Sequence, residues 1–356
     1  MTTDVYVATG TRTALGNFGG SLKDRPMTGL SAEIVGACIE RSGASPENFD
    51  HIVFTTTCPT DKDSLFAARV VGMKGGLPAD AAALDVSRAC ASGLQAVISA
   101  GQQVATGQSQ LAIAAGAEMF SRAPFAVTTS RWGNARGHQQ LEDMLEWCYR
   151  CPFSLEYMGD TAENLAAKYG YDRSPMDEYA VQSQARALAA IESGFLARQI
   201  HPVLVPEGKS SRTFCIDESP RAGITVERLA RLAPAFQADG KVTAGNASGV
   251  TDGAAAIPVG SKESLMSAGI KPIARIVDWA VVGVEPSLMG HGPVPAIEQC
   301  LRRTGQAISD IDYFEINEAF AVVNLHVEAQ LGIPRDRHNL YGGGISVGHP
   351  PGVTGL

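Results

Sequence analysis

Three side chains that could serve covalent catalysis, as nucleophile, base or hydrogen-bond donor, lie at Cys90, Asn317 and His349. Cys90 lies in DVSRACASGL, where a β-rich run gives way to a helical pattern whose first turn holds small residues. A cysteine at a helix N-terminus feels the positive end of the helix dipole, so we expect its reactive thiolate to be favoured. A buried structural cysteine fits this segment equally well.

His349 and Asn317 could complete such a site. His349 lies in YGGGISVGHPPGVTG, where the density of glycines implies close approach of backbone. Because Pro350 suits the first turn of a helix, we expect His349 at a helix entrance, as for Cys90, and the two could act as nucleophile and base. Asn317, in EINEAF, is predicted as a helix N-cap or, alternatively, as an amide aimed at a reacting carbonyl. The cap is the simpler interpretation of that segment alone.

Composition narrows the function classes. The chain has 356 residues, 45% of them hydrophobic, and a net charge of −8, which argues against binding to nucleic acid or to an anionic membrane. No apolar run is long enough to span a bilayer, and the N-terminus shows no secretory pattern. Seven scattered cysteines favour free thiols in a reducing compartment, the cytoplasm. Cys148 and Cys151 form a lone C-x-x-C, for which zinc or redox use is disfavoured, and we expect no metal.

The pattern of apolar residues predicts an α/β fold in which strands and helices alternate. From about residue 121 to 248 the α/β alternation gives way to short polar and aromatic stretches, which predicts a cap over the core. The predicted strands are 5–8, 51–55, 82–86, 111–115, 273–284 and 311–316; the predicted helices are 29–41, 65–72, 90–106, 174–193, 294–303 and 318–330.

Four segments in this order resemble the thiolase family: DVSRACASGL, VTAGNASGVTDG, EINEAF and the glycine-rich segment around His349. The stretches VATGTRTALGNFGGSLKD, GAEMFSRAPF, YMGDTAENLA and MGHGPVPAI are also similar to thiolase sequences, so the resemblance covers the whole chain. It implies a duplicated five-layer αβαβα core with an inserted loop domain. The N-terminal half would comprise residues 1–120 and 251–271, the coenzyme A-binding loop domain residues 121–250, and the C-terminal half residues 272–356, which looks incomplete.

The resemblance also implies roles for single residues. Cys90 would attack the thioester or ketoacyl carbonyl, His349 would take the thiol proton, and Asn317 would fix a water facing the carbonyl oxygen. No cofactor would be bound permanently, since coenzyme A arrives as part of the acyl-CoA substrate. Homodimers or homotetramers are implied. The residues expected to contact coenzyme A or the acyl chain are Arg221, Ser248, Phe236, Met158, Ala247, Met289, Phe320 and Tyr157.

The chain departs from the family pattern in several places. Thiolases continue past the GHP segment and carry a second cysteine in a Cys-x-Gly-Gly-Gly motif, whereas this sequence stops at Leu356. We expect a longer natural protein, the alternative being a chain that ends here with impaired Claisen condensation. Tyr157 stands where short-chain thiolases often have His, and His291 is an unusual polar ring. A ketoacyl-synthase-like condensing enzyme and a non-catalytic coenzyme A-binding subunit remain as alternatives to a thiolase.

Overall fold

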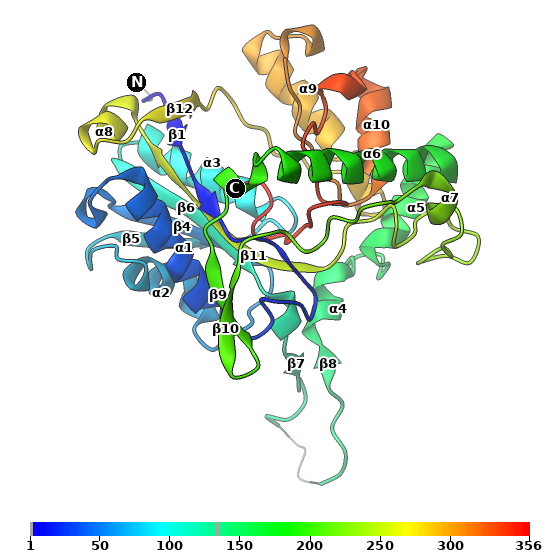
Figure 1. The fold of residues 1–356 in the computed structure, drawn as a ribbon, viewed down its shortest axis with the longest axis horizontal. Coiled ribbons are helices and arrows are strands. Elements are labelled where there is room, and N and C mark those ends of the chain that lie inside the picture. Colours follow the sequence, from blue (N-terminus) through cyan, green and yellow to red (C-terminus); the bar gives the residue numbers. More distant parts are fainter. Residues whose placement is uncertain (1–2, 133–135) are drawn as a thin grey trace.

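One mixed sheet organises the computed structural model, which describes residues 3–132 and 136–356 (Figure 1). Its main path runs β12–β1–β11–β6–β4–β5, and two short strands, β2 (Thr11–Arg12) and β3 (Gly16–Asn17), also pair with β11. β4 is parallel to β5 and β6, whereas β11 is antiparallel to β6 and β1. The strands of the main path are β12 (Pro272–Arg275), β1 (Tyr6–Ala8), β11 (Thr251–Gly260), β6 (Leu111–Glu118), β4 (His51–Thr55) and β5 (Ala82–Val86).

Helices cover both faces of this sheet because its central strands are apolar on both sides. Along β6, Ile113 and Ala115 join the cluster formed with α1 (Met27–Ser42) and α2 (Ala67–Lys74). The alternate residues Ala112 and Ala114 pack instead against α3 (Ser92–Ala105). This period of two places α3, which follows Cys90, on the face opposite to α1 and α2.

The chain between β6 and β11 forms helices and two hairpins. One hairpin, β7–β8, points away from the body of the molecule, and α6 contacts α10 of the C-terminal region (Figure 1). The elements of this stretch are β7 (Phe125–Ala126), β8 (Glu142–Asp143), α4 (Met144–Tyr149), α5 (Met158–Tyr169), α6 (Arg173–Glu192), β9 (Val203–Glu207), β10 (Ser210–Phe214) and α7 (Val226–Leu229). After β11 come α8 (Lys262–Ser267), the 3-10 helical segment η5 (Pro286–His291), α9 (Pro293–Thr304) and α10 (Ala321–Leu331).

Most of the predicted elements are confirmed, with strands β4 and β5 at the predicted residues. The strand predicted over 273–284 is wrong beyond Arg275, because its partner β1 is only three residues long and the ladder ends with it. The strand predicted over 311–316 is also wrong. In that segment Phe314 forms an isolated bridge with His338, and one bridge makes no strand ladder.

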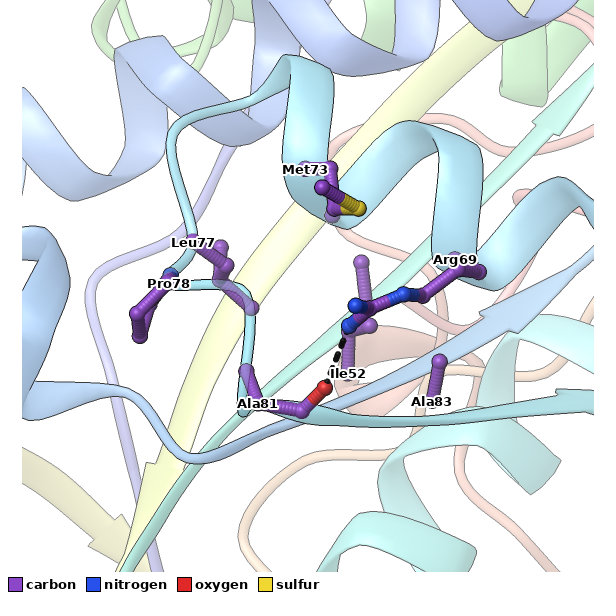
Figure 2. A pocket seen from close by; sticks show the side chains of 8 residues that line it. Ile52, Arg69, Met73, Leu77, Pro78, Ala81 and Ala83 are labelled. Atoms are coloured by element: carbon purple, nitrogen blue, oxygen red, sulfur yellow. Dashed lines mark hydrogen bonds between the residues drawn. The ribbon is translucent and has the colours of Figure 1, made fainter.

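An arginine of α2 binds the loop that leads into the edge strand β5. Figure 2 shows the shallow hollow between α2 and the strands, where Ile52 and Ala83 lie beneath Arg69. Arg69 Nη1 donates to the carbonyl of Ala81 (2.8 Å) and Nη2 to that of Ala79 (2.6 Å). These bonds hold the loop that leads into β5, the strand that ends just before Cys90. No helix in the described part of the chain is long and apolar enough to cross a membrane.

We predict that the sheet tolerates no side chain at Gly116. A Cβ there would stand 2.1 Å from the carbonyl oxygen of Gly352 and 2.7 Å from Cγ2 of Thr55. Because backbone cannot move aside cheaply, Gly116→Ala should destabilise the fold by about 2 kcal/mol or more. Thermal denaturation checks this, with exposed Gly283→Ala as the control, since no atom lies within 4 Å of a Cβ at 283. Equal melting temperatures for the two variants would contradict the close contact.

Candidate active site

A strained turn holds Cys90 between β5 and α3. Ala89 adopts a left-handed conformation (φ +45°), which is unusual for a residue with a Cβ. The turn is closed by bonds from the amide of Ala91 to the carbonyl of Arg88 and from that of Ser92 to the carbonyl of Ala89, both 3.0 Å. Cys90 therefore lies at the corner, one residue before the helix N-cap Ala91. No sequence signal pointed to Ala89.

The predicted preference of Cys90 for the thiolate is wrong. Burial raises the pKa of the Cys90 thiol to about 11, and the nearby carboxylate of Glu118 adds to this shift. These two effects on the pKa are larger than the effect of the helix N-terminus. Moving a thiolate out of water costs more free energy than its attraction to the partial charge of the helix dipole provides. Cys90 is consequently a protonated thiol at neutral pH, and it needs a base before it can attack.

His349 is a neutral, oriented imidazole. Asn317 Nδ2, which can only donate, lies 3.2 Å from Nε2, and Thr354 Oγ1 lies 2.7 Å from Nδ1. Since Thr354 donates its own proton to the carbonyl of Pro350, the assignment that satisfies every group puts the imidazole proton on Nδ1 and leaves Nε2 as the acceptor. Burial lowers the pKa of His349 to about 4, so Nε2 keeps its lone pair at neutral pH. The sequence did not indicate Thr354.

The segments carrying Cys90 and His349 meet through glycines. A Cβ on Gly93, in the first turn of α3, would stand 2.4 Å from the carbonyl oxygen of Thr354, and one on Gly355 would stand 2.7 Å from the amide of Leu94. The residues after His349 form a helical turn, with the amide of Thr354 bonded to the carbonyl of Pro350 (3.0 Å). The first turn of α3 and the turn after His349 thus lie in backbone contact, as the glycine density predicts. The helix expected after His349 is limited to this turn.

A buried carboxylate ties these segments to β4. Glu118 is fully buried and accepts bonds from the amides of Thr57 (3.0 Å), Cys58 (3.1 Å) and Gly352 (3.0 Å). The hydroxyl of Thr57 donates a further bond of 2.5 Å. Burial raises the pKa of Glu118, while the Thr57, Cys58 and Thr56 donors act to lower it. Glu118 was not among the predicted site residues, although an acidic group at the end of the otherwise apolar strand 111–118 was an available signal.

A second buried carboxylate, Glu318, plays the same part beside Asn317. It accepts bonds from the hydroxyls of Tyr179 (3.0 Å) and Ser183 (2.6 Å) in α6 and from the amide of Ile345 (3.1 Å). Glu318 therefore joins the Asn317 segment, the glycine-rich segment and the long helix α6. Its position just before α10 gave no hint of these partners, since they are distant in sequence.

Most residues expected to line the ligand tunnel gather in one place. Met158, Ala247 and Met289 pack against the apolar cluster that contains Phe320. The ring of Phe236 meets Phe320 edge to face at 6.2 Å. Ser248 joins them through its amide, which donates to the carbonyl of Ala319 (2.9 Å).

Two expected ligand residues lie outside this cluster. Arg221 is exposed, and its amide bonds to Oε1 of Gln184 in α6 (2.8 Å). The hydroxyl of Tyr157 lies between Oε2 of Glu146 (2.5 Å) and Nη2 of Arg150 (2.6 Å). Tyr157 is thus held by surface charges, although it directly precedes Met158.

The two cysteines of the C-x-x-C pair have different surroundings. Cys148 Sγ lies 3.9 Å from the carbonyl oxygen of Thr57, whereas Cys151 is buried. The described residues contain no group of three or more His, Cys, Asp or Glu side chains arranged to hold a metal ion.

The comparisons with known proteins agree along the whole chain. The family model "Thiolase, N-terminal domain" matches residues 5–263 and "Thiolase, C-terminal domain" matches residues 270–356. The beta-ketothiolase BktB of Cupriavidus necator is 42% identical over 356 residues, covering all of this chain and 90% of the relative. A probable acetyl-CoA acyltransferase of Staphylococcus aureus is 39% identical over 355 residues, 99% of this chain and 90% of its own length.

Solved structures give the same result. The crystal structure of human mitochondrial 3-ketoacyl-CoA thiolase superimposes with a TM-score of 0.96 at 38% identity, over 99% of this chain and 90% of that one. The same enzyme in complex with CoA gives 0.94 at 37% identity, over 99% and 89%. These matches confirm the predicted thiolase-like α/β fold. The chain therefore belongs to the thiolase family of acyl-CoA C-acyltransferases.

Proposed function

We propose that the enzyme thiolyses 3-ketoacyl-CoA or condenses acetyl-CoA through an acyl group carried on Cys90. The observation that carries this proposal is the backbone contact between the first turn of α3 and the segment after His349. That contact brings the segment that carries a protonated thiol beside the segment that carries a neutral imidazole. A weak nucleophile and an adjacent base are the components of covalent acyl transfer.

Acylation would then proceed in balanced steps. Cys90 sulfur attacks the thioester carbonyl while its proton passes to Nε2 of His349, and the carbonyl oxygen gains negative charge. When the carbonyl re-forms, the bond to the coenzyme A sulfur breaks and that thiolate takes the proton from His349. The low pKa of His349 favours this return, because a buried imidazolium is a stronger acid than one in water.

Asn317 and Thr354 act on the base in this scheme. The Thr354 hydroxyl fixes the Nδ1–H tautomer, so the lone pair always stands on Nε2. In the resting protein the Asn317 amide bonds to that same nitrogen and sets the plane of the ring, and this bond breaks when Nε2 takes the thiol proton. It also supplies a donor at the reaction centre, directly or through a water, where a developing oxyanion needs one.

Coenzyme A would lie on the region formed by residues 121–250. The cluster of Met158, Met289, Phe320 and Phe236 offers an apolar wall, and neighbouring Ala247 and Ser248 a narrow side for the pantetheine arm. Exposed Arg221 supplies a cation for the phosphates of coenzyme A. A local cation is needed because the net charge of the chain, −8, repels phosphate groups. No permanent cofactor enters this chemistry. The seven free cysteines support a reducing compartment, the cytoplasm.

Intact mass after incubation with acetyl-CoA tests the covalent step. We expect one acetyl group per chain, located on the Cys90 peptide, and none in Cys90→Ala. Cys300→Ala is the matched control and should acetylate normally, because Cys300 lies in α9, outside the proposed site. A folded wild-type protein that gains no acetyl group, or gains it at another cysteine, would contradict the proposal.

We also propose that two copies of the chain pair across β5, as a homodimer or as part of a homotetramer. β5 is bonded to β4 along one edge, and four of its five residues are exposed. Leu84 of β5 is 37% exposed, and other apolar side chains near the strand are also exposed, including Phe66 (66%) and Met73 (49%). An open strand edge flanked by apolar surface is a ready site for pairing with another chain.

Sedimentation of a β5 variant tests this pairing. Leu84→Lys should shift the assembly towards a smaller species, because a charge would have to be buried in the interface. Leu204→Lys, on the exposed side of β9, should leave the mass unchanged. A monomeric wild-type protein, or a Leu84→Lys variant that keeps its mass, would rule out the β5 interface.

A further inference from the structure

A chain of hydrogen-bonded polar rings centres on the buried His326. His326 of α10 is fully buried, between His291 at the end of η5 and Tyr171 just after α5. Nδ1 of His291 is 2.9 Å from Nε2 of His326, and the hydroxyl of Tyr171 is 3.3 Å from Nδ1 of His326. The ring of Tyr169 lies against His326, with centroids 4.4 Å apart. One hydrogen-bond chain therefore joins three separate elements.

His326 is uncharged at neutral pH and uses both ring nitrogens. Burial, with a smaller contribution from His291, lowers the pKa of His326 to about 4. A neutral imidazole has one donor and one acceptor, so His326 donates to one neighbour and accepts from the other. Breaking either bond would leave a buried polar atom unpaired, which is unfavourable. The chain thus holds η5 in one register against α10, a constraint that apolar contacts alone do not impose.

The same three elements carry the apolar wall of the proposed acyl site. Met158 is the first residue of α5, Met289 lies in η5, and Phe320 is the N-cap of α10. The η5 segment packs closely against α10 and α5. A Cβ on Gly290, next to Met289, would stand 2.8 Å from Cγ2 of Val323 and 3.0 Å from Cδ2 of Leu165. A shift of η5 would therefore displace Met289.

We propose that the His291–His326–Tyr171 chain positions Met289 and so determines which acyl groups the enzyme accepts. The inference rests on the proposed function, since it assigns a selectivity to that site. These residues touch no reacting atom and are positioning residues. They act on substrates whose acyl group reaches the Met289 wall and leave the attack by Cys90 on a small acyl group unaffected.

Two substitutions at position 326 separate this role from simple packing. In His326→Leu the hydrogen bonds are lost and the volume is nearly kept, whereas the amide of His326→Gln can still reach His291. We measure kcat and KM for thiolysis of acetoacetyl-CoA and of a branched 3-ketoacyl-CoA. His326→Leu should change the ratio of the two kcat/KM values by about fivefold or more, mainly through KM of the branched substrate, while His326→Gln stays within about twofold of wild type.

The control is His201→Leu, because His201 lines a separate cleft with Thr11 and Arg41 and should leave the ratio unchanged. An unchanged ratio in folded, active His326→Leu would overturn the positioning role alone. Equal losses for both substrates in His326→Leu and His326→Gln would also overturn it, since they indicate general destabilisation. A wild-type protein that turns over neither substrate would overturn the proposed function and this inference together.

Discussion

The fold depends on a contact between two backbones, where the first turn of α3 meets the turn that follows His349. A Cβ on Gly93 would stand 2.4 Å from the carbonyl oxygen of Thr354 and 2.6 Å from that of Val353. A side chain at position 93 would therefore force the two segments apart. The carbonyl of Gly352 meets Gly116 of β6 in the same way. Because backbone is rigid on this scale, the glycines set the distance between the first turn of α3 and the turn after His349, and with it the placement of Cys90 relative to His349.

Once these segments are in contact, burial governs the chemistry. It raises the pKa of Cys90 and lowers that of His349, so both groups are neutral at rest. A neutral pair avoids placing an isolated charge in a site shielded from water. Charge then develops only when the thiol attacks, and the proton has one prepared acceptor. Glu118 and Glu318 each accept hydrogen bonds from several segments, and these bonds hold the segments that carry the site in place.

The local patterns of the sequence predicted much of this arrangement. The alternation of apolar runs predicted β4 and β5, and glycine density predicted the close approach around His349. Resemblance in four ordered motifs predicted the family, which the comparisons confirm. The failures share a physical cause. A strand over 311–316 needs a ladder that one bridge to His338 does not provide, and the pKa of Cys90 depends on burial by residues remote in the chain. The His291–His326 bond and the contacts of Glu118 with Thr57 and Gly352 were not predicted for the same reason, because they join residues that are distant in the sequence. Thr354 lies only five residues from His349, but no local pattern assigned it a role.

The central claim is that His349 removes the proton of Cys90. The direct measurement is the rate of Cys90 alkylation by iodoacetamide, followed by peptide mass, in wild type and in His349→Gln from pH 5.5 to 8.5. A base with a pKa of about 4 is already free over that range, so the wild-type rate should be nearly flat. In His349→Gln the rate should be at least about tenfold lower at pH 6 and rise with pH, because the thiolate must then form unaided. Coincident rate profiles for the two proteins would contradict the account.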